Sequence, residues 1–139
     1  MFRRVYTRTV VFTKDFDGWN NRKKKLDATV ARRYYHPREI WWCALGVNVG
    51  FEQDGTGTGY QRPVLILQGL SLETCLVVPL TTSKKPSKYR ASVGTVGGKS
   101  AQAILSQIRV VDTKRLVNRI DILDQATFAV IRKSAIAML

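Results

Sequence analysis

An acidic residue, an amide and an arginine lie close together around a glycine-rich stretch in the middle of the chain. The sequence FEQDGTGTGYQRPVLIL places Glu52 and Gln53 before three glycines and Arg62 after them. A guanidinium offers a rigid fork of donors that matches phosphate oxygens, and Pro63 fixes the backbone directly after it. A carboxylate can act as a general base. These residue types suit a site for a phosphate-containing substrate with Arg62 as its main residue, and the alternative is that Arg62 is an ordinary surface arginine.

Hydroxyl and lysine side chains follow the apolar run LVVPLT. Thr81 ends this run, and its hydroxyl is suited to donate a hydrogen bond to a phosphate, or else to cap a turn at the end of a strand. Thr82 and Ser83 come next, so the functional hydroxyl could lie one residue further on. The basic stretch KKPSKYR, which starts with Lys84 and Lys85, can follow a phosphate backbone or form an ordinary solvated surface.

Other kinds of site are disfavoured by the residue types present. His36 is the only histidine, so a two-histidine acid–base pair is impossible, and we expect an exposed or packed loop residue. Cys43 and Cys75 lie in apolar runs without the spacing of metal ligands, so we expect small buried residues and no bound metal. The glycine spacing fits neither a Rossmann fingerprint nor a P-loop. No run suits a signal peptide or a membrane span, so we expect a cytoplasmic protein without membrane contact.

The composition predicts one globular domain with a strong positive charge. The chain has 139 residues, of which 45% are hydrophobic, and this is enough for one compact core. A formal net charge of +13 favours nucleic acid, an anionic membrane or an acidic protein as the partner. Residues 1–38 contain eleven Lys or Arg and three acids, so the N-terminal segment is the more basic part.

The elements that must position these residues are mainly strands. Residues 13–33 predict a helix that starts at a Thr13 or Asp15 cap and breaks before Pro37. Its expected apolar face consists of Phe16, Trp19, Leu26 and Val30. Short runs rich in β-branched and aromatic residues follow, bounded by Gly, Pro, Ser or Lys. These runs are 40–47, 62–70, 73–82, 89–96 and 100–111.

The end of the chain predicts one more strand and a second helix. Residues 114–123 predict a short turn and a strand, and Asp124 caps a helix whose apolar face has Phe128, Ile131, Ala135 and Met138. Five or six strands without β-α-β alternation indicate a mainly β fold, a sheet that curls into a small barrel. One of Trp41 and Trp42 should face the core, because neighbouring strand residues point to opposite faces.

Four sequence blocks resemble, in their order and spacing, the PemK/MazF family of toxin endoribonucleases. They are REIWWCALG, GFEQ with RPVLIL, VVPLTTS and SQIRVVDTKRL, and the resemblance runs from about Arg38 to Met138. It implies an SH3-like β-barrel of the PemK/MazF/CcdB type with a C-terminal helix, to which this chain adds an N-terminal helix. The expected division is a basic extension, residues 1–37, and a toxin domain, residues 38–139.

The resemblance also implies an activity and partners. The activity is metal-independent cleavage of single-stranded RNA by 2′-hydroxyl attack, which leaves a 2′,3′-cyclic phosphate or 3′-phosphate and a 5′-hydroxyl. The partners are a second copy in a homodimer and a cognate antitoxin with an acidic tail. Arg62, Thr81 and Glu52 are the expected catalytic residues, although Glu52 is either a base or structural. The expected RNA-binding residues are Gln53, Tyr60, Thr82, Ser83, Lys84, Lys85, Ser106 and Gln107.

Several features depart from the family pattern or leave alternatives open. The loop 54–61 is longer than usual, and we expect a mobile flap over the site, with Glu52 and Gln53 as one wall. Ile104 and Ser106 occupy positions where some members have a catalytic Arg and Asp, and Arg109 and Asp112 are expected to form an ion pair. A gyrase-type protein poison on the same fold and a non-catalytic RNA-binding relative remain alternatives. The N-terminal helix could pack on the barrel, widen the RNA groove or occupy the antitoxin site.

Overall fold

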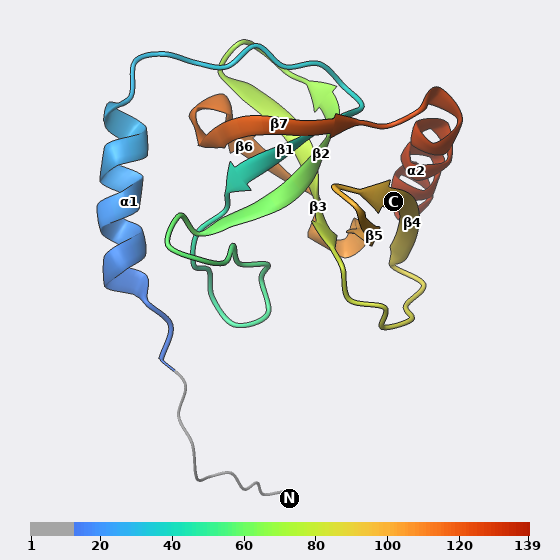
Figure 1. Cartoon of the computed structure of the whole chain (residues 1–139), viewed down its shortest axis with the longest axis horizontal. Coiled ribbons are helices and arrows are strands. Elements are labelled where there is room, and N and C mark those ends of the chain that lie inside the picture. The colour runs from blue at the N-terminus through green and yellow to red at the C-terminus, as the bar shows by residue number, and fades with distance from the viewer. Residues whose placement is uncertain (1–12) are drawn as a thin grey trace, which may run out of the picture.

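The computed structural model describes residues 13–139, and the first part of the predicted basic extension, residues 1–12, lies outside the described residues. The chain is mainly β, with helices on opposite sides of the strands (Figure 1). The elements are α1 (Phe16–Ala28), β1 (Glu39–Ala44), β2 (Gln61–Gly69), β3 (Thr74–Thr81), β4 (Arg90–Val96), β5 (Lys99–Ile104), the 3-10 helix η1 (Leu105–Gln107), β6 (Arg109–Asp112), the 3-10 helix η2 (Thr113–Arg115), β7 (Leu116–Ile122) and α2 (Gln125–Ala137).

The strands form one curled antiparallel sheet, which confirms the predicted mainly β class with a helix near each end. The hydrogen-bonded order is β4-β5-β3-β2-β1-β7, and β6 pairs with β3 beside this path. The first half of β3, Thr74–Val77, pairs with β6, whereas Leu80 and Thr81 at its end pair with β5. Because β3 pairs with β5 and with β6 over different halves, the sheet bends around this strand into a half-barrel.

The predicted strand 100–111 is wrong, because the structure divides it into β5 and β6. The described residues therefore contain seven strands rather than five or six. Ala103 pairs with Leu80 at one end of β3, while Arg109 pairs with Val77 nearer its middle. The chain turns a corner through η1 to make both pairings. Apolar residues continue through this corner, with Ile104 and Leu105 both buried, so their pattern does not reveal the break.

Buried side chains form two clusters on opposite faces of the central strands. On β2, Leu65 belongs to one cluster, while its neighbours Val64 and Ile66 belong to the other. Cys43 and Cys75 are buried in the second cluster, as predicted. Both are free, and burial raises their pKa to about 12 and about 11. The sheet therefore has apolar residues on both faces, and each face needs a covering element.

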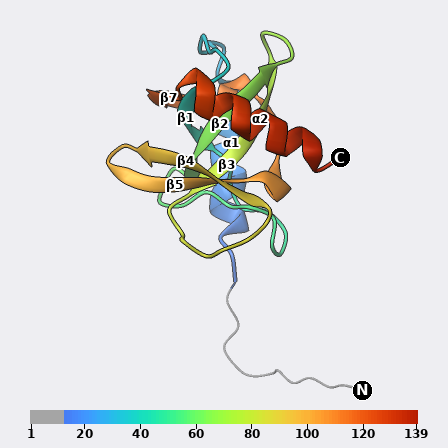
Figure 2. The same cartoon turned by 90° about the vertical axis from the view of Figure 1, so that its right-hand side faces the viewer.

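Helix α2 covers the first cluster, as the sequence predicts. Figure 2 shows it lying across the strands. The Asp124 carboxylate caps its start by accepting hydrogen bonds from the Thr127 backbone N–H, at 2.9 Å, and from the Thr127 hydroxyl, at 2.8 Å. Ile131 is fully buried, and Phe128 and Ala135 pack beside it. The last predicted contact residue, Met138, is exposed.

Helix α1 is shorter than the predicted helix 13–33. The Asp15 carboxylate caps it, as predicted, by accepting a 2.9 Å hydrogen bond from the Gly18 N–H, but the helix ends at Ala28. Of the expected apolar face only Trp19 is buried, whereas Phe16 and Val30 are exposed. The Trp19 ring lies against Gly46, and the Arg115 guanidinium lies 5.5 Å from the ring centroid. Trp19 is thus the one buried side chain of α1, and near the end of the helix Lys114 donates a 2.9 Å hydrogen bond to the Asp27 carbonyl.

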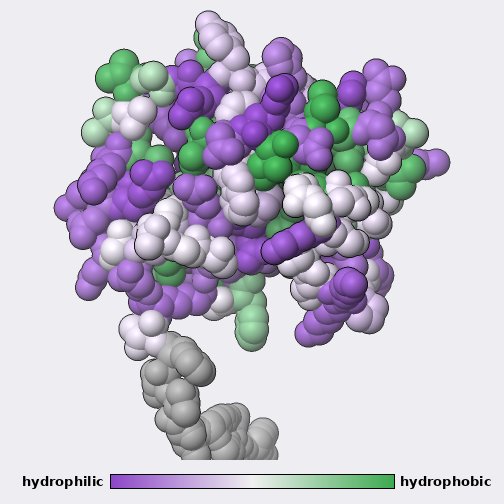
Figure 3. Space-filling model, viewed as in Figure 1, coloured by the Kyte–Doolittle hydropathy of each residue, from purple (hydrophilic) through white to green (hydrophobic). Residues whose placement is uncertain are grey.

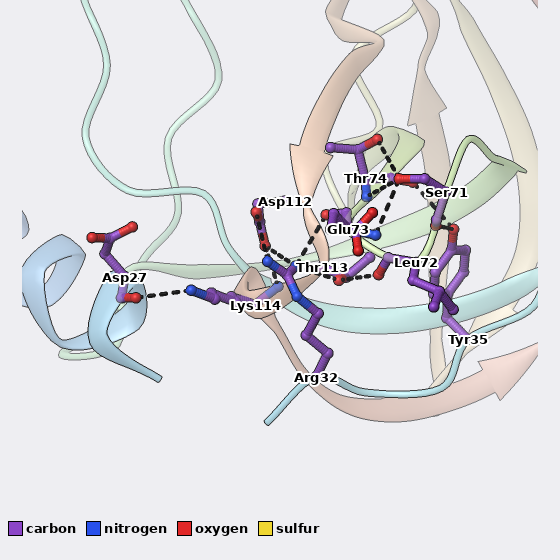
Figure 4. A network of polar contacts seen from close by, with 10 residues as sticks. All are labelled: Asp27, Arg32, Tyr35, Ser71, Leu72, Glu73, Thr74, Asp112, Thr113 and Lys114. Atoms are coloured by element: carbon purple, nitrogen blue, oxygen red, sulfur yellow. Dashed lines mark hydrogen bonds and ion pairs between the residues drawn. The ribbon is translucent and has the colours of Figure 1, made fainter. Parts of the chain in front are cut away.

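The chain after α1 is extended and is fastened by polar contacts. The Arg32 guanidinium forms a 2.6 Å ion pair with Asp112 and donates a 2.9 Å hydrogen bond to the Thr113 hydroxyl (Figure 4). Burial alone would raise the pKa of Asp112, but the hydrogen bonds from Arg32 and from the Lys114 N–H lower it. The predicted Arg109–Asp112 ion pair is wrong, because residues three apart on a strand point to opposite faces.

The surface of the described residues is polar with scattered apolar side chains. In the view of Figure 3, green side chains are dispersed among purple ones rather than gathered in one area. Within residues 13–139, neither helix has the length and apolar character to cross a membrane. His36 is 77% exposed at its side chain, in agreement with a loop histidine.

Candidate active site

A hollow of about 750 Å³ lies where β2 begins and β3 ends. Strand pairing explains why these ends meet. Val64 pairs with Pro79, and continuing this register by two residues brings Arg62 beside Thr81 on the same face. The hairpin between β4 and β5 and residue Ile120 of β7 close the other sides. The lining residues are Trp42, Thr56, Gln61, Arg62, Pro63, Leu80, Thr81, Thr82, Ser83, Val96, Gly97, Lys99, Ala101 and Ile120.

Arg62 is half-buried and held from two sides. Its Nε donates a 2.7 Å hydrogen bond to the Asp54 carbonyl, and its Nη1 donates a 3.1 Å hydrogen bond to the Leu80 carbonyl. Burial lowers the pKa of the guanidinium, and the charge of Asp54 opposes this effect. A guanidinium has five N–H donors, so three remain after these two bonds. The structure thus presents an oriented cation with free donors at the hollow.

Hydroxyl groups lie beside this cation at the end of β3. The Thr81 oxygen accepts a 3.1 Å hydrogen bond from the Ser83 N–H, so Thr81 does cap a turn. An accepting hydroxyl still has its own proton to donate. Thr82 and Ser83 also line the hollow, and the Ser83 hydroxyl accepts a 3.2 Å hydrogen bond from Arg90. Lys84 and Lys85 follow them on the exposed chain before β4.

Glu52 and Gln53 do not line the hollow. Glu52 is exposed, and its carboxylate accepts a 3.0 Å hydrogen bond from the Val49 N–H, which closes a turn of the loop. The Gln53 N–H donates to the Gln107 side chain at 3.3 Å, and the Gln107 amide donates in turn to the Phe51 carbonyl at 3.2 Å. The Gln107 side chain therefore makes two hydrogen bonds to the loop backbone, and Glu52 stabilises the shape of the loop.

The glycine-rich loop folds back on itself and contacts α1. Thr56 and Gln61 form a short bridge, and both line the hollow. Tyr60 has a φ of 54°, an uncommon conformation outside glycine, and its hydroxyl donates a 2.6 Å hydrogen bond to Asp15. This hydrogen bond lowers the pKa of Asp15 and raises the pKa of Tyr60. Tyr60 thus turns toward α1 rather than toward the hollow.

Other predicted residues lie near but outside the hollow, and some lining residues were missed. Ser106 is exposed on η1 and does not line the hollow. Trp42 lines it while Trp41 is buried, so the expectation that one tryptophan faces the core is confirmed. Lys99, a second cation of the hollow, was missed because only the pairing of β5 with β3 brings it there. The turn residues Gly97 and Gly98 before it were the available signal for that hairpin.

The lining residues favour binding of an anion through charge and hydrogen bonds. They include two cations and three hydroxyl-bearing side chains of the β3 end, but no acid and no histidine. Within residues 13–139 no group of three or more His, Cys, Asp or Glu side chains is arranged to hold a metal ion. This donor set suits phosphate oxygens, with Arg62 as the fixed contact.

Solved structures with the same fold include MazF proteins and an endoribonuclease. MazF from Deinococcus radiodurans is 17% identical, with a TM-score of 0.63 over 75% of this chain and 94% of that chain. An endoribonuclease from a mycobacterial species, solved in complex with its cognate antitoxin, is 15% identical, with a TM-score of 0.54 over 76% and 93%. The Mycobacterium tuberculosis toxin MazF-mt6 is 18% identical, with a TM-score of 0.53 over 72% and 97%. At these identities the similarity shows the fold.

The amino-acid sequence identifies the protein family to which the chain belongs. Residues 36–139 match the family described as PemK-like, MazF-like toxin of type II toxin–antitoxin system. The chain therefore belongs to this family of toxins, and the resemblance to PemK/MazF is confirmed. A search of curated proteins found no match. The match begins at His36, so α1 and the chain before it lie outside the matched region.

Proposed function

We propose that the hollow around Arg62 binds single-stranded RNA and cleaves it without a metal ion. One observation carries the proposal: a half-buried guanidinium, fixed by the Asp54 and Leu80 carbonyls, projects its remaining donors beside hydroxyl groups in a toxin of this family. Arg62 would bind the scissile phosphate and stabilise the extra negative charge of the phosphorane. Stabilisation of this kind is usually the largest single contribution to catalysis.

The remaining roles follow from the residues beside Arg62. The Thr81 hydroxyl would donate to a second phosphate oxygen, and Lys99 would add positive charge from the opposite side of the hollow. Water accepts the proton of the 2′-hydroxyl as its oxygen attacks phosphorus, and the bond to the 5′-oxygen breaks. The 5′-oxygen takes up a proton from water, so the products are a 2′,3′-cyclic phosphate and a 5′-hydroxyl. Because the Glu52 carboxylate is bonded to the Val49 N–H, we assign Glu52 to the shape of the loop rather than to proton transfer.

A cognate antitoxin with an acidic tail would occupy the same hollow. The net charge of +13 and the cations Arg62 and Lys99 favour an acidic peptide as strongly as an RNA backbone. A mycobacterial endoribonuclease with this fold has been solved with its cognate antitoxin. A homodimer, a cytoplasmic location and the division at residue 37 are part of the same proposal.

Primer extension on a long natural RNA tests the activity. The RNA is incubated in EDTA with the wild-type protein, with Arg62→Ala or with Arg132→Ala, a matched loss of an exposed arginine on α2. We expect discrete stops with the wild type and Arg132→Ala, and a rate about 10²- to 10³-fold lower with Arg62→Ala. Glu52→Gln should keep most of the activity.

The outcomes separate the alternatives. RNA that stays intact with pure wild-type protein, but is retained in a filter-binding assay, would show a non-catalytic RNA-binding relative. Gyrase-dependent DNA breaks on expression, without RNA cleavage, would show a protein poison. Cleavage that Glu52→Gln abolishes while the loop keeps its structure would return Glu52 to the role of general base.

A further inference from the structure

Residues 14–19, at and just before the start of α1, contact both ends of the β1–β2 loop, residues 45–60. Trp19 is 4% exposed, and its indole lies against Gly46 at the first end of the loop. At the other end, the Tyr60 hydroxyl donates its hydrogen bond to Asp15, and the rings of Tyr60 and Trp19 lie 5.6 Å apart. Two side chains from the N-terminal extension thus fix the points where this loop leaves β1 and enters β2.

Lys14 holds the middle of the same loop. Its ammonium donates 2.8 Å hydrogen bonds to the carbonyls of Asn48 and Gly50 and forms a 2.9 Å ion pair with the Asp54 carboxylate. An ammonium has three donors, so the whole hydrogen-bonding capacity of Lys14 is directed at the loop. The side chain is 31% exposed, which leaves it shielded by the loop that it binds.

Asp54 connects Lys14 to the hollow. One carboxylate oxygen of Asp54 pairs with Lys14, and the other accepts a 2.7 Å hydrogen bond from the Asn48 N–H. The backbone carbonyl of Asp54 is the group that accepts the 2.7 Å hydrogen bond from Arg62 Nε. A continuous series of direct contacts therefore runs from the N-terminal extension through Asp54 to the guanidinium that we propose to bind phosphate.

We infer that residues 14–19 are a built-in positioning element for the active site, with Lys14 as a positioning residue for Arg62. The inference rests on the proposed function for the role of Arg62. A glycine-rich loop has little conformational preference of its own, so fixed contacts from outside add to its internal hydrogen bonds in holding its shape. An Arg62 that is already oriented when RNA arrives needs no reorganisation during the reaction. These contacts come from outside the family match at residues 36–139, so they are a feature of this chain's extension.

Three single variants test the role of Lys14. Lys14→Ala removes the contacts, and Lys14→Arg keeps a cation that can reach the same oxygens. Lys23→Ala removes the same charge from α1, where Lys23 makes no ion pair or side-chain hydrogen bond within residues 13–139. The measurements are hydrogen exchange of the loop amides, RNA affinity, and the single-turnover cleavage rate at saturating RNA.

With Lys14→Ala we expect the amides of Asn48 and Gly55 to exchange about 10-fold faster or more, because their local structure opens more often. The saturating cleavage rate should fall about 10- to 100-fold, the loss that follows from slight misplacement of a catalytic group. Lys14→Arg should recover part of both losses, and Lys23→Ala should alter neither. In an Arg62→Ala background, Lys14→Ala should lower the rate no further, since it acts through Arg62.

Three results would overturn the inference. One is loop exchange that is unchanged in Lys14→Ala. Another is an equal loss of RNA affinity in the Lys14→Ala and Lys23→Ala variants while both keep the wild-type cleavage rate at saturating RNA. This result would show that Lys14 contributes through charge attraction alone. The third is a full additional rate loss in the Arg62→Ala background. Hydrogen exchange needs no RNA, so a released loop in a protein that does not cleave RNA would refute the proposed function and leave the positioning contacts supported.

Discussion

The contact between Trp19 and Gly46 can be tested with two matched glycine substitutions in the β1–β2 loop. Gly46 has a φ of 85°, and Gly50 has a φ of 56°. A Cβ at Gly46 would overlap the Trp19 indole, whereas a Cβ at Gly50 would have nothing within 4 Å among the described residues. Gly46→Ala and Gly50→Ala therefore share the backbone penalty, and only Gly46→Ala also displaces the ring.

The expected difference follows from the burial of Trp19. An L-residue in the left-handed region costs about 1–2 kcal/mol, and this applies to both variants. A buried tryptophan removes on the order of 200 Å² from water, worth about 5 kcal/mol at 25 cal/mol per Å² as an upper bound. Loss of a buried tryptophan side chain costs about 3–5 kcal/mol in practice. We therefore expect Gly46→Ala to lower the free energy of unfolding by about 3–5 kcal/mol more than Gly50→Ala does, or to release α1 for the same free energy.

Urea unfolding, followed by circular dichroism for the barrel and by hydrogen exchange for residues 16–28, measures both results. A helix of this length is marginal in isolation, so displacement of Trp19 should leave α1 unprotected while the barrel stays folded. In a Trp19→Ala background the overlap is gone, and Gly46→Ala should then resemble Gly50→Ala. Equal stabilities of the two glycine variants in the wild-type background, with α1 still protected, would refute the reasoning.

Three further predictions concern the barrel. Glu39→Ala should lower the free energy of unfolding, measured by urea denaturation, by about 2–3 kcal/mol. Buried Glu39 accepts a 3.0 Å hydrogen bond from the Trp41 indole N–H, and the variant would leave this N–H without a partner. A decrease of less than about 1 kcal/mol would contradict the prediction. Contacts with Arg32 lower the folded-state pKa of Asp112 below 3.8, so the unfolded chain binds the proton more tightly than the folded chain does. The stabilisation by this carboxylate is therefore lost as the pH falls through and below that value. Asp112→Asn should make stability depend less on pH in this range, and an unchanged slope of stability against pH would argue against the prediction. Cys43, buried with a pKa of about 12, should react with a thiol reagent only as fast as the protein unfolds, and rapid reaction in native buffer would disagree.

Local features of the chain were decided by the sequence itself. Asp15 and Asp124 cap the two helices as predicted, because a cap depends on a side chain and the backbone N–H groups two or three residues later. The strand runs around Cys43 and Cys75 also lie where the pattern indicates, since burial of apolar residues follows from the strand period. The four ordered motifs carried the family, and with it the prediction that Arg62 is the main residue of the site.

Contacts between distant segments were decided only by the tertiary structure. Asp112 pairs with Arg32 rather than with Arg109, because the extended chain after α1 crosses the turn that follows β6. Lys99 reaches the hollow through the pairing of β5 with β3, and Lys14 reaches the loop because Trp19 docks α1 on the barrel. A sequence pattern reports which face of an element is apolar, but strand register and helix docking decide which polar groups meet. The orientation of Arg62 depends on such meetings, since its two acceptors come from a loop and a strand that the fold brings together.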